Sequence, residues 1–161
     1  MSSDTFTTAM FLITAVIAAG VLINAVFPVV YQMAGTFNSA THTSDVRLRT
    51  DFVIVTTFAA ANGQNVDGQI WMKNVGSQPI PVEDIKRSDV FFGPVGSFSR
   101  LEINTGWTYT LSDLNNNKFW DPGETLGIQG TAAGPVSSGS FVYFQFVLPN
   151  GVWRSNQFSV S

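Results

Sequence analysis

The sequence predicts an N-terminal long hydrophobic α-helix followed by an all-β antiparallel sandwich. Two observations predict this class. Residues 5–44 contain no Asp, Glu, Lys or Arg, and the first part of that run is almost wholly apolar. After Asp45 the chain becomes a series of alternating or β-branched segments separated by Gly, Pro and Asn, the usual pattern of strands and turns. We therefore expect a helix and polar linker over residues 1–44 and a β-sandwich head over residues 45–161.

The apolar run at residues 5–31 is long enough to cross a membrane. About 20 apolar residues in a helix span the hydrocarbon of a bilayer. A cleaved secretory signal has basic residues before a shorter apolar core, whereas the residues before this run, MSSDT, include one acid and no base. We expect a retained helix that is kinked at Pro28 and continues over residues 31–43, with Gly35 as a candidate break. Small residues at positions 15, 18, 19 and 20 either allow close helix packing or reflect the ordinary composition of membrane helices.

The overall composition argues against several classes of function. There are 8 Lys and Arg against 11 Asp and Glu, so the clustered positive charge needed for nucleic acid is missing. The chain has no cysteine and a single histidine, His42, which excludes a disulfide framework, a cysteine nucleophile and a histidine metal cluster. Glu83 and Asp84, close to Lys86 and Arg87, fit a solvated loop. We therefore expect that the protein is not an enzyme.

Short strands with turn signals between them fill the head. We expect strands at residues 51–58, 69–74, 88–92, 98–103, 107–111, 125–129, 142–147 and 152–160. In the segment at 142–147, Val142, Phe144 and Phe146 alternate with Tyr143 and Gln145, which predicts one buried face. Seven or eight such strands with little helical periodicity are typical of a two-sheet sandwich.

The strongest local motif is a potential calcium loop at residues 113–124, DLNNNKFWDPGE. Its side-chain oxygens fall at positions 1, 3, 5, 9 and 12 of twelve: Asp113, Asn115, Asn117, Asp121 and Glu124. This is the spacing with which calcium loops surround the ion, and the backbone carbonyl of Phe119 would serve at position 7. The departure is Lys118 at position 6, where glycine is usual because the backbone there is left-handed; a lysine costs about 1–2 kcal/mol.

A metal-free surface turn is the alternative, since Asn and Asp favour turns by themselves. Five correctly placed oxygens are more than a turn needs, so we expect Ca²⁺ as a weakly bound cofactor, with a dissociation constant of about 10⁻⁴ to 10⁻³ M as in extracellular modules. Such a site fills outside a cell. It therefore favours an external head, against the opposite indication that Arg47 and Arg49 give through the positive-inside rule.

The chain resembles the archaeal type IV pilin-like proteins, and within them the FlaG (ArlG) family of archaellum accessory proteins. The resemblance rests on the helix and on the segment FPVVY-x-M-x-G-x-F, residues 27–37, which leads into Asp45-x-Arg47-x-Arg49-x-Asp51. It covers the first third of the chain closely and the head by its strand pattern, and it implies an immunoglobulin-like or pilin-like sandwich. No pilin-type cleavage motif, a basic residue and a glycine before the apolar run, is visible. This departure fits an unprocessed accessory protein better than a filament subunit.

The resemblance implies a motor-anchoring protein of the archaeal motility machinery. Its head would lie outside the membrane, in the pseudoperiplasm below the S-layer, and would assemble with further copies of itself and with a sister accessory protein as a stator. Exposed aromatic residues such as Phe91 and Phe92 are candidates for contacts between heads. The alternative is a filament-forming archaellin or type IV pilin-like subunit, with its helices bundled in the core of an extracellular filament. A membrane-tethered enzyme or a solute-binding sandwich is a third class of function. Against it, the sequence shows no convergent set of polar residues apart from the metal loop.

Overall fold

The protein is described from a computed structural model, in which residues 2–161 are placed. It consists of two compact units, one ending at Ser44 and the other comprising Asp45–Ser161. The described part of the first unit, residues 2–44, is helical, because α1 runs without interruption over Ser2–Arg49. The last turn of α1, from Asp45 onward, belongs to the second unit, which holds all the strands.

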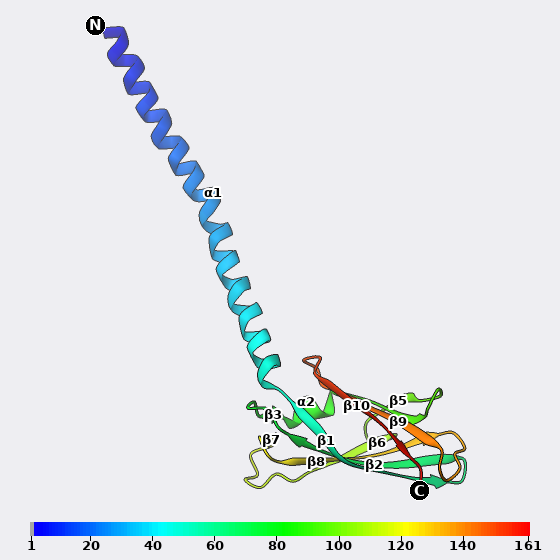
Figure 1. Ribbon diagram of the computed structural model, residues 1–161. Coiled ribbons are helices and arrows are strands. Elements are labelled where there is room, and N and C mark those ends of the chain that lie inside the picture. Colours follow the sequence, from blue (N-terminus) through cyan, green and yellow to red (C-terminus); the bar gives the residue numbers. More distant parts are fainter. Residues whose placement is uncertain (1) are drawn as a thin grey trace. The chain divides into compact units, whose positions relative to one another are not determined.

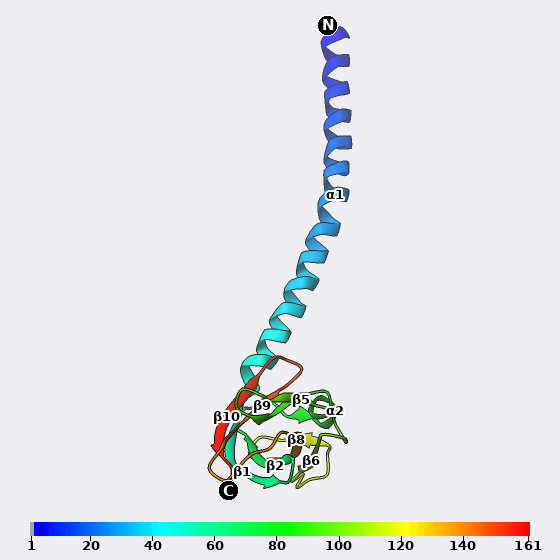
Figure 2. The ribbon, with the colours of Figure 1, turned by 90° about the vertical axis from the view of Figure 1, so that its right-hand side faces the viewer.

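The helix α1 is longer than the sequence indicated and is not broken at Gly35. Its path changes direction in the light-blue part that includes Pro28 (Figure 2), where a proline removes one backbone donor and crowds the preceding turn. Every described large apolar side chain between Phe6 and Phe37 is exposed within the chain itself. The helix therefore presents apolar surface on all sides.

The head is a sandwich of two four-stranded antiparallel sheets (Figure 1). The first sheet has the order β1-β2-β8-β6 and the second the order β10-β9-β4-β5; a small third sheet pairs β3 with β7. The strands are β1 (Phe52–Asn62), β2 (Asn65–Asn74), β3 (Ile80–Pro81), β4 (Asp89–Pro94), β5 (Ser99–Leu101), β6 (Trp107–Leu111), β7 (Phe119–Trp120), β8 (Thr125–Ala133), β9 (Phe141–Val147) and β10 (Trp153–Ser159). A short helix, α2 (Val82–Lys86), follows β3.

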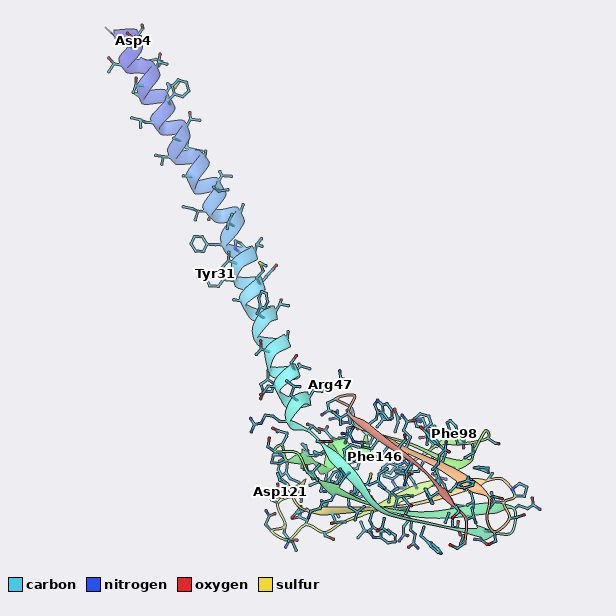
Figure 3. The ribbon with its side chains drawn as sticks, in the orientation of Figure 1. Asp4, Tyr31, Arg47, Phe98, Asp121 and Phe146 are labelled. Carbon is cyan, nitrogen blue, oxygen red and sulfur yellow. The ribbon has the colours of Figure 1, made fainter. Side chains whose placement is uncertain are left out.

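Aromatic side chains fill the space between the two large sheets. The ring of Phe146, labelled in Figure 3, meets that of Phe52 edge-on at a centroid distance of 5.6 Å. Phe92 lies against the backbone of the facing sheet, because a Cβ on Gly68 would come within 2.5 Å of its ring. Burial of such rings between sheets supplies most of the stabilisation of a sandwich.

The predicted sandwich is confirmed, with differences at the ends of its strands. The strand at residues 107–111 and the buried set Val142, Phe144 and Phe146 are found as predicted. β2 begins four residues earlier and β8 ends four residues later than the sequence indicated, because their pairing continues past the apolar stretches. β5 is shorter than expected. The helix α2 and the strands β3 and β7 were missed, since each is too short to show a periodic pattern.

The last turn of α1 is fastened to the loop that follows β2. The carbonyl of Arg49, free at the end of the helix, accepts hydrogen bonds from the amides of Ser77 (2.9 Å) and Gln78 (3.1 Å). The carbonyl of Asp51 in turn accepts bonds from the amides of Val75 and Gly76. We call this contact the helix joint.

A glycine is needed at the centre of the helix joint. A Cβ at Gly76 would lie 2.4 Å from the Arg49 carbonyl oxygen and 2.5 Å from the Asp51 nitrogen. Both atoms are backbone atoms and cannot move aside as a side-chain end could. The close approach of the two segments therefore depends on Gly76.

Replacing Gly76 by alanine is expected to lower the free energy of unfolding of the head by about 1–3 kcal/mol, the usual cost of forcing a methyl group into a packed site. All four tryptophans lie in the head, so the intrinsic fluorescence of the full-length protein in micelles during urea unfolding measures this loss. Gly127→Ala is the control, because its Cβ would meet other atoms at 3.5 Å or more. Equal stability of the Gly76→Ala variant and the wild type would show that the joint is not tightly packed.

Candidate functional sites: the Asn-rich loop, the helix joint and the anchor helix

The predicted calcium loop, residues 113–124, connects β6 to β8 and is not entirely irregular. Its residues Phe119 and Trp120 form β7, which pairs with β3 and fixes the second half of the loop to the body of the head. Phe119, expected to offer its carbonyl at position 7, therefore lies in a strand. Figure 3 labels Asp121, the residue that follows β7.

The first half of the loop wraps around the carboxylate of Asp113. This group accepts hydrogen bonds from the backbone amides of Asn117 (3.3 Å) and Lys118 (2.9 Å). Lys118 has a φ of 64°, the left-handed conformation that position 6 of a calcium loop requires and that glycine usually supplies. The unfavourable residue at position 6 thus adopts the backbone conformation that the motif needs.

Two asparagine amides converge on Asp121. The Asn115 and Asn117 side-chain nitrogens donate to the same Asp121 oxygen, Oδ2, at 2.9 and 2.8 Å. Three of the predicted ligand side chains thus meet at one point. The loop folds so that oxygen-bearing groups far apart in it become neighbours.

Glu124 closes the loop from the other end and is only 8% exposed. Its Oε1 accepts the amide of Leu114 and its Oε2 accepts the amide of Asp121, both at 3.0 Å. Its carbonyl accepts the indole N–H of Trp120 at 2.9 Å. Charge-assisted bonds of this kind offset the cost of burying a carboxylate. Glu124 therefore has a structural role in holding the loop together.

Carboxylates alone do not form a metal site here. Over residues 2–161, acidic and histidine side chains nowhere gather in a group of three that could hold a metal ion. A cation at this loop would have to be bound by a mixed set, in which amide and carbonyl oxygens complete the carboxylates of Asp113 and Asp121.

Asn74 links this loop to the helix joint and was not singled out from the sequence. It is fully buried at the end of β2, and its amide nitrogen donates to the carbonyls of Trp120 (2.8 Å) and Gln78 (3.1 Å). Its side-chain oxygen accepts the amide of Gly76 at 3.0 Å. One side chain thus connects β7, which lies in the loop, with the segment that holds the end of α1.

The outer face of the first sheet carries exposed apolar side chains. Phe58 on β1 is 45% exposed and Trp71 on β2 is 36% exposed. The register pairs Phe58 with Gln69 and Thr56 with Trp71, so the two rings are diagonal neighbours on one face. We call this surface, which includes Val53 on the same strand, the β1–β2 face.

The other residues singled out from the sequence lie elsewhere. Phe92 is fully buried, so its expected role in contacts between heads is wrong; it faces the core because it alternates with half-buried Phe91. Glu83 lies in α2, not in a loop. There the Lys86 ammonium donates to it at 2.7 Å, and this hydrogen bond lowers the pKa of the Glu83 carboxyl. His42 is exposed on α1.

The helix α1 is the one described helix with the length and apolar character to cross a membrane. None of its most apolar stretch is buried against the rest of the chain. The acidic residue nearest its start is Asp4, and the next charged residue is Asp45.

Comparison with known proteins relates this chain to components of the archaeal flagellum, the archaellum. A family described as archaeal-type flagellin matches residues 6–158. An uncharacterized protein of Archaeoglobus fulgidus is 25% identical over 162 residues, 99% of each chain. The archaellum periplasmic stator protein FlaG of Sulfolobus acidocaldarius is 27% identical with a TM-score of 0.52, over 68% of this chain and 99% of that one.

The long helix and the sandwich also occur together in a filament. The archaeal flagellum of Methanospirillum hungatei has a TM-score of 0.59 over 92% of this chain and 91% of that one, and at 17% identity it shares the fold. The family match covers nearly the whole sequence, including both the helix and the head. This chain is a member of the archaeal-type flagellin family.

Proposed function

We propose that this protein is a non-enzymatic, stator-like component of the archaellum, anchored in the membrane by α1. The head lies outside the membrane, in the space below the S-layer. There it contacts further copies of itself, a sister protein of the FlaF type and the S-layer, and it holds the motor while the filament turns. We infer a structural role because the chain offers a membrane anchor in α1, the helix joint and the exposed β1–β2 face.

The likeness to FlaG is the observation that carries this proposal. It extends over 99% of that structure at 27% identity, whereas the likeness to the filament is one of fold at 17%. The periplasmic stator protein complex of FlaF and FlaG from Sulfolobus acidocaldarius contains a chain that is 26% identical, with a TM-score of 0.53, over 66% of this chain and 87% of that one. This supports a sister protein of the FlaF type as a partner.

A filament subunit is the second candidate function. The same long helix and sandwich build the Methanospirillum hungatei filament, and an exposed apolar helix can be covered by other helices as well as by lipid. The two functions differ in where the protein is found. A stator stays in the cell envelope, whereas a subunit leaves with the filament.

Shearing filaments from cells of the source organism separates these functions. We expect quantitative mass spectrometry to find the protein in the envelope fraction and only in traces in the sheared filaments. The matched control is the major filament protein of the same cells, which must show the opposite distribution. If this chain is a main component of the sheared filaments, the stator-like role is wrong and the filament role replaces it.

We also propose that the loop at residues 113–124 binds Ca²⁺ through Asp113, Asn115, Asn117, the Phe119 carbonyl, Asp121 and Glu124, and that Glu124 exchanges the two amide hydrogen bonds it accepts in the unbound loop for the ion. The spacing, the left-handed Lys118 and the convergence of two amides on Asp121 support it. The side-chain oxygens of Asn115 and Asn117 accept the backbone amides of Asn117 (3.1 Å) and Phe119 (2.9 Å), so on binding the ion both side chains have to turn away from these amides. A cation would stiffen a segment that Asn74 connects to the helix joint.

Calcium at about 10 mM is expected to raise the free energy of unfolding of the head by about 1.4–2.7 kcal/mol, given a dissociation constant of about 0.1–1 mM. Asp121→Asn keeps the shape of the side chain and is expected to abolish this rise. Asp67→Asn, a carboxylate of the first sheet bonded to Thr131 (2.7 Å), is the control and should keep it. Chelator titrations of the full-length protein, followed by tryptophan fluorescence, measure the effect, and no rise with wild type refutes the site.

The β1–β2 face is the surface that we propose for contacts between heads, in place of Phe91 and Phe92. Exposed rings such as those of Phe58 and Trp71 are enriched at protein interfaces. The edge of β1 lies beside β10, and the carbonyl of Ala59 accepts the amide of Ser161 (2.9 Å), so a second head would meet the exposed face of this strand and not its edge.

A photo-reactive phenylalanine analogue tests this surface in living cells. At position 58, p-benzoylphenylalanine is expected to form cross-links to another copy or to the sister protein, which mass spectrometry identifies. The control is the same analogue in place of Phe141, an exposed ring at the start of β9 in the other sheet, where we expect few cross-links. Cross-links from position 141 but not from 58 would place the contact on the other sheet.

A further inference from the structure

Apolar side chains continue along one side of α1 beyond the span that lipid must cover. Residues 9–30 are long enough for the hydrocarbon layer at 1.5 Å per residue. After them the helix becomes polar, yet Met33 is 55% exposed and Phe37 is 67% exposed. Large apolar groups in an otherwise polar stretch indicate a partner.

These side chains follow the spacing of a coiled coil. Val30, Met33, Phe37 and Ala40 are separated by three, four and three residues, which places them in one stripe. Before the bend at Pro28 the helix is apolar on every side, so this stripe is distinct only after it. We call the part from Val30 to Ala40 the outer stripe.

The surface of the outer stripe has the form that helix packing requires. A groove on α1 is lined by Val29, Gln32, Met33, Thr36, Phe37 and Ala40. Among them Met33, Thr36, Phe37 and Ala40 stand at positions i, i+3, i+4 and i+7 and include three residues of the outer stripe. Four residues so spaced form the hole that receives a side chain of a neighbouring helix in a coiled coil.

The uncharged residues beside the stripe allow an identical helix to approach. The flanking positions of this repeat hold Ala34, Thr36, Thr41 and Thr43, so two parallel copies meet no like charges. The hydroxyls of Thr36 and Thr43 donate to carbonyls of their own helix at 2.9 and 3.0 Å, and they need no partner across the interface. The stripe ends where charges begin, at Asp45.

We propose that the outer stripe pairs with the outer stripe of a second copy of this chain in a parallel coiled coil just outside the membrane. The proposal rests on the proposed function, because a membrane anchor holds all copies in one direction and at one depth. Met33 then lies beside Met33 and Phe37 beside Phe37 of the other copy. Pairing covers the apolar surface that neither the chain itself nor lipid covers, and it joins the anchors of two heads.

Single cysteines test the pairing cleanly because the protein has none of its own. The full-length variants Met33→Cys and Phe37→Cys are expected to form disulfide-linked dimers on mild oxidation in isolated cell envelopes. Ser39→Cys and His42→Cys lie off the stripe on the same helix and serve as matched controls, with several-fold less dimer. Head tryptophan fluorescence confirms that each variant is folded.

Each result of this experiment decides the proposal. Preferential dimers at positions 33 and 37 support it. Equal dimers at all four positions indicate random collision in the membrane, and none at any position indicates that lipid or another protein covers the stripe; both overturn it. Because dimers are scored in envelopes, a chain found only in sheared filaments refutes the proposed function, whereas an envelope chain without preferential dimers refutes the pairing alone.

Discussion

One physical constraint dominates the structure: the apolar surface of an uncharged helix has to be covered by lipid or by other helices. From residue 5 to residue 44 the chain has no charged side chain, and its large apolar groups there are exposed within the chain. Water cannot solvate such a surface at low cost, since each buried Leu or Ile side chain is worth about 1.5–3 kcal/mol. The helix therefore has to lie in lipid or among other helices. A stator anchored in the membrane meets that requirement with lipid, and a filament subunit meets it with the helices of its neighbours.

The helix joint gives the head a firm connection to the end of this helix. The Arg49 carbonyl, the backbone around Gly76 and the buried amide of Asn74 form a continuous set of hydrogen bonds that reaches the Asn-rich loop. The ion pair of Asp51 with Arg154 on β10 adds a contact to the second sheet. The residues at the end of α1 are thus bonded to segments of both sheets of the sandwich.

The sequence predicted the parts of the fold that have a regular pattern. The apolar run predicted α1, and the alternation at Phe144 and Phe146 predicted a buried face, because period and polarity reflect burial directly. The family resemblance, drawn from the helix and residues 27–37, is confirmed by the match over residues 6–158. Gly76 and Asn74 could not be recognised, since their importance comes from contacts with segments distant in sequence. Phe92 was placed wrongly because two adjacent phenylalanines do not reveal which one faces inward.

The proposed role requires that the apolar helix stays on the mature protein and holds an external head at the membrane. The intact mass of the native protein from washed envelopes, combined with protease treatment of intact spheroplasts, tests this requirement. We expect a mass that includes residues 5–31, resistance of that segment to the protease, and release of the head from the outside. A native chain that begins beyond Tyr31, or a head that is digested only after the membrane is opened, would contradict the account.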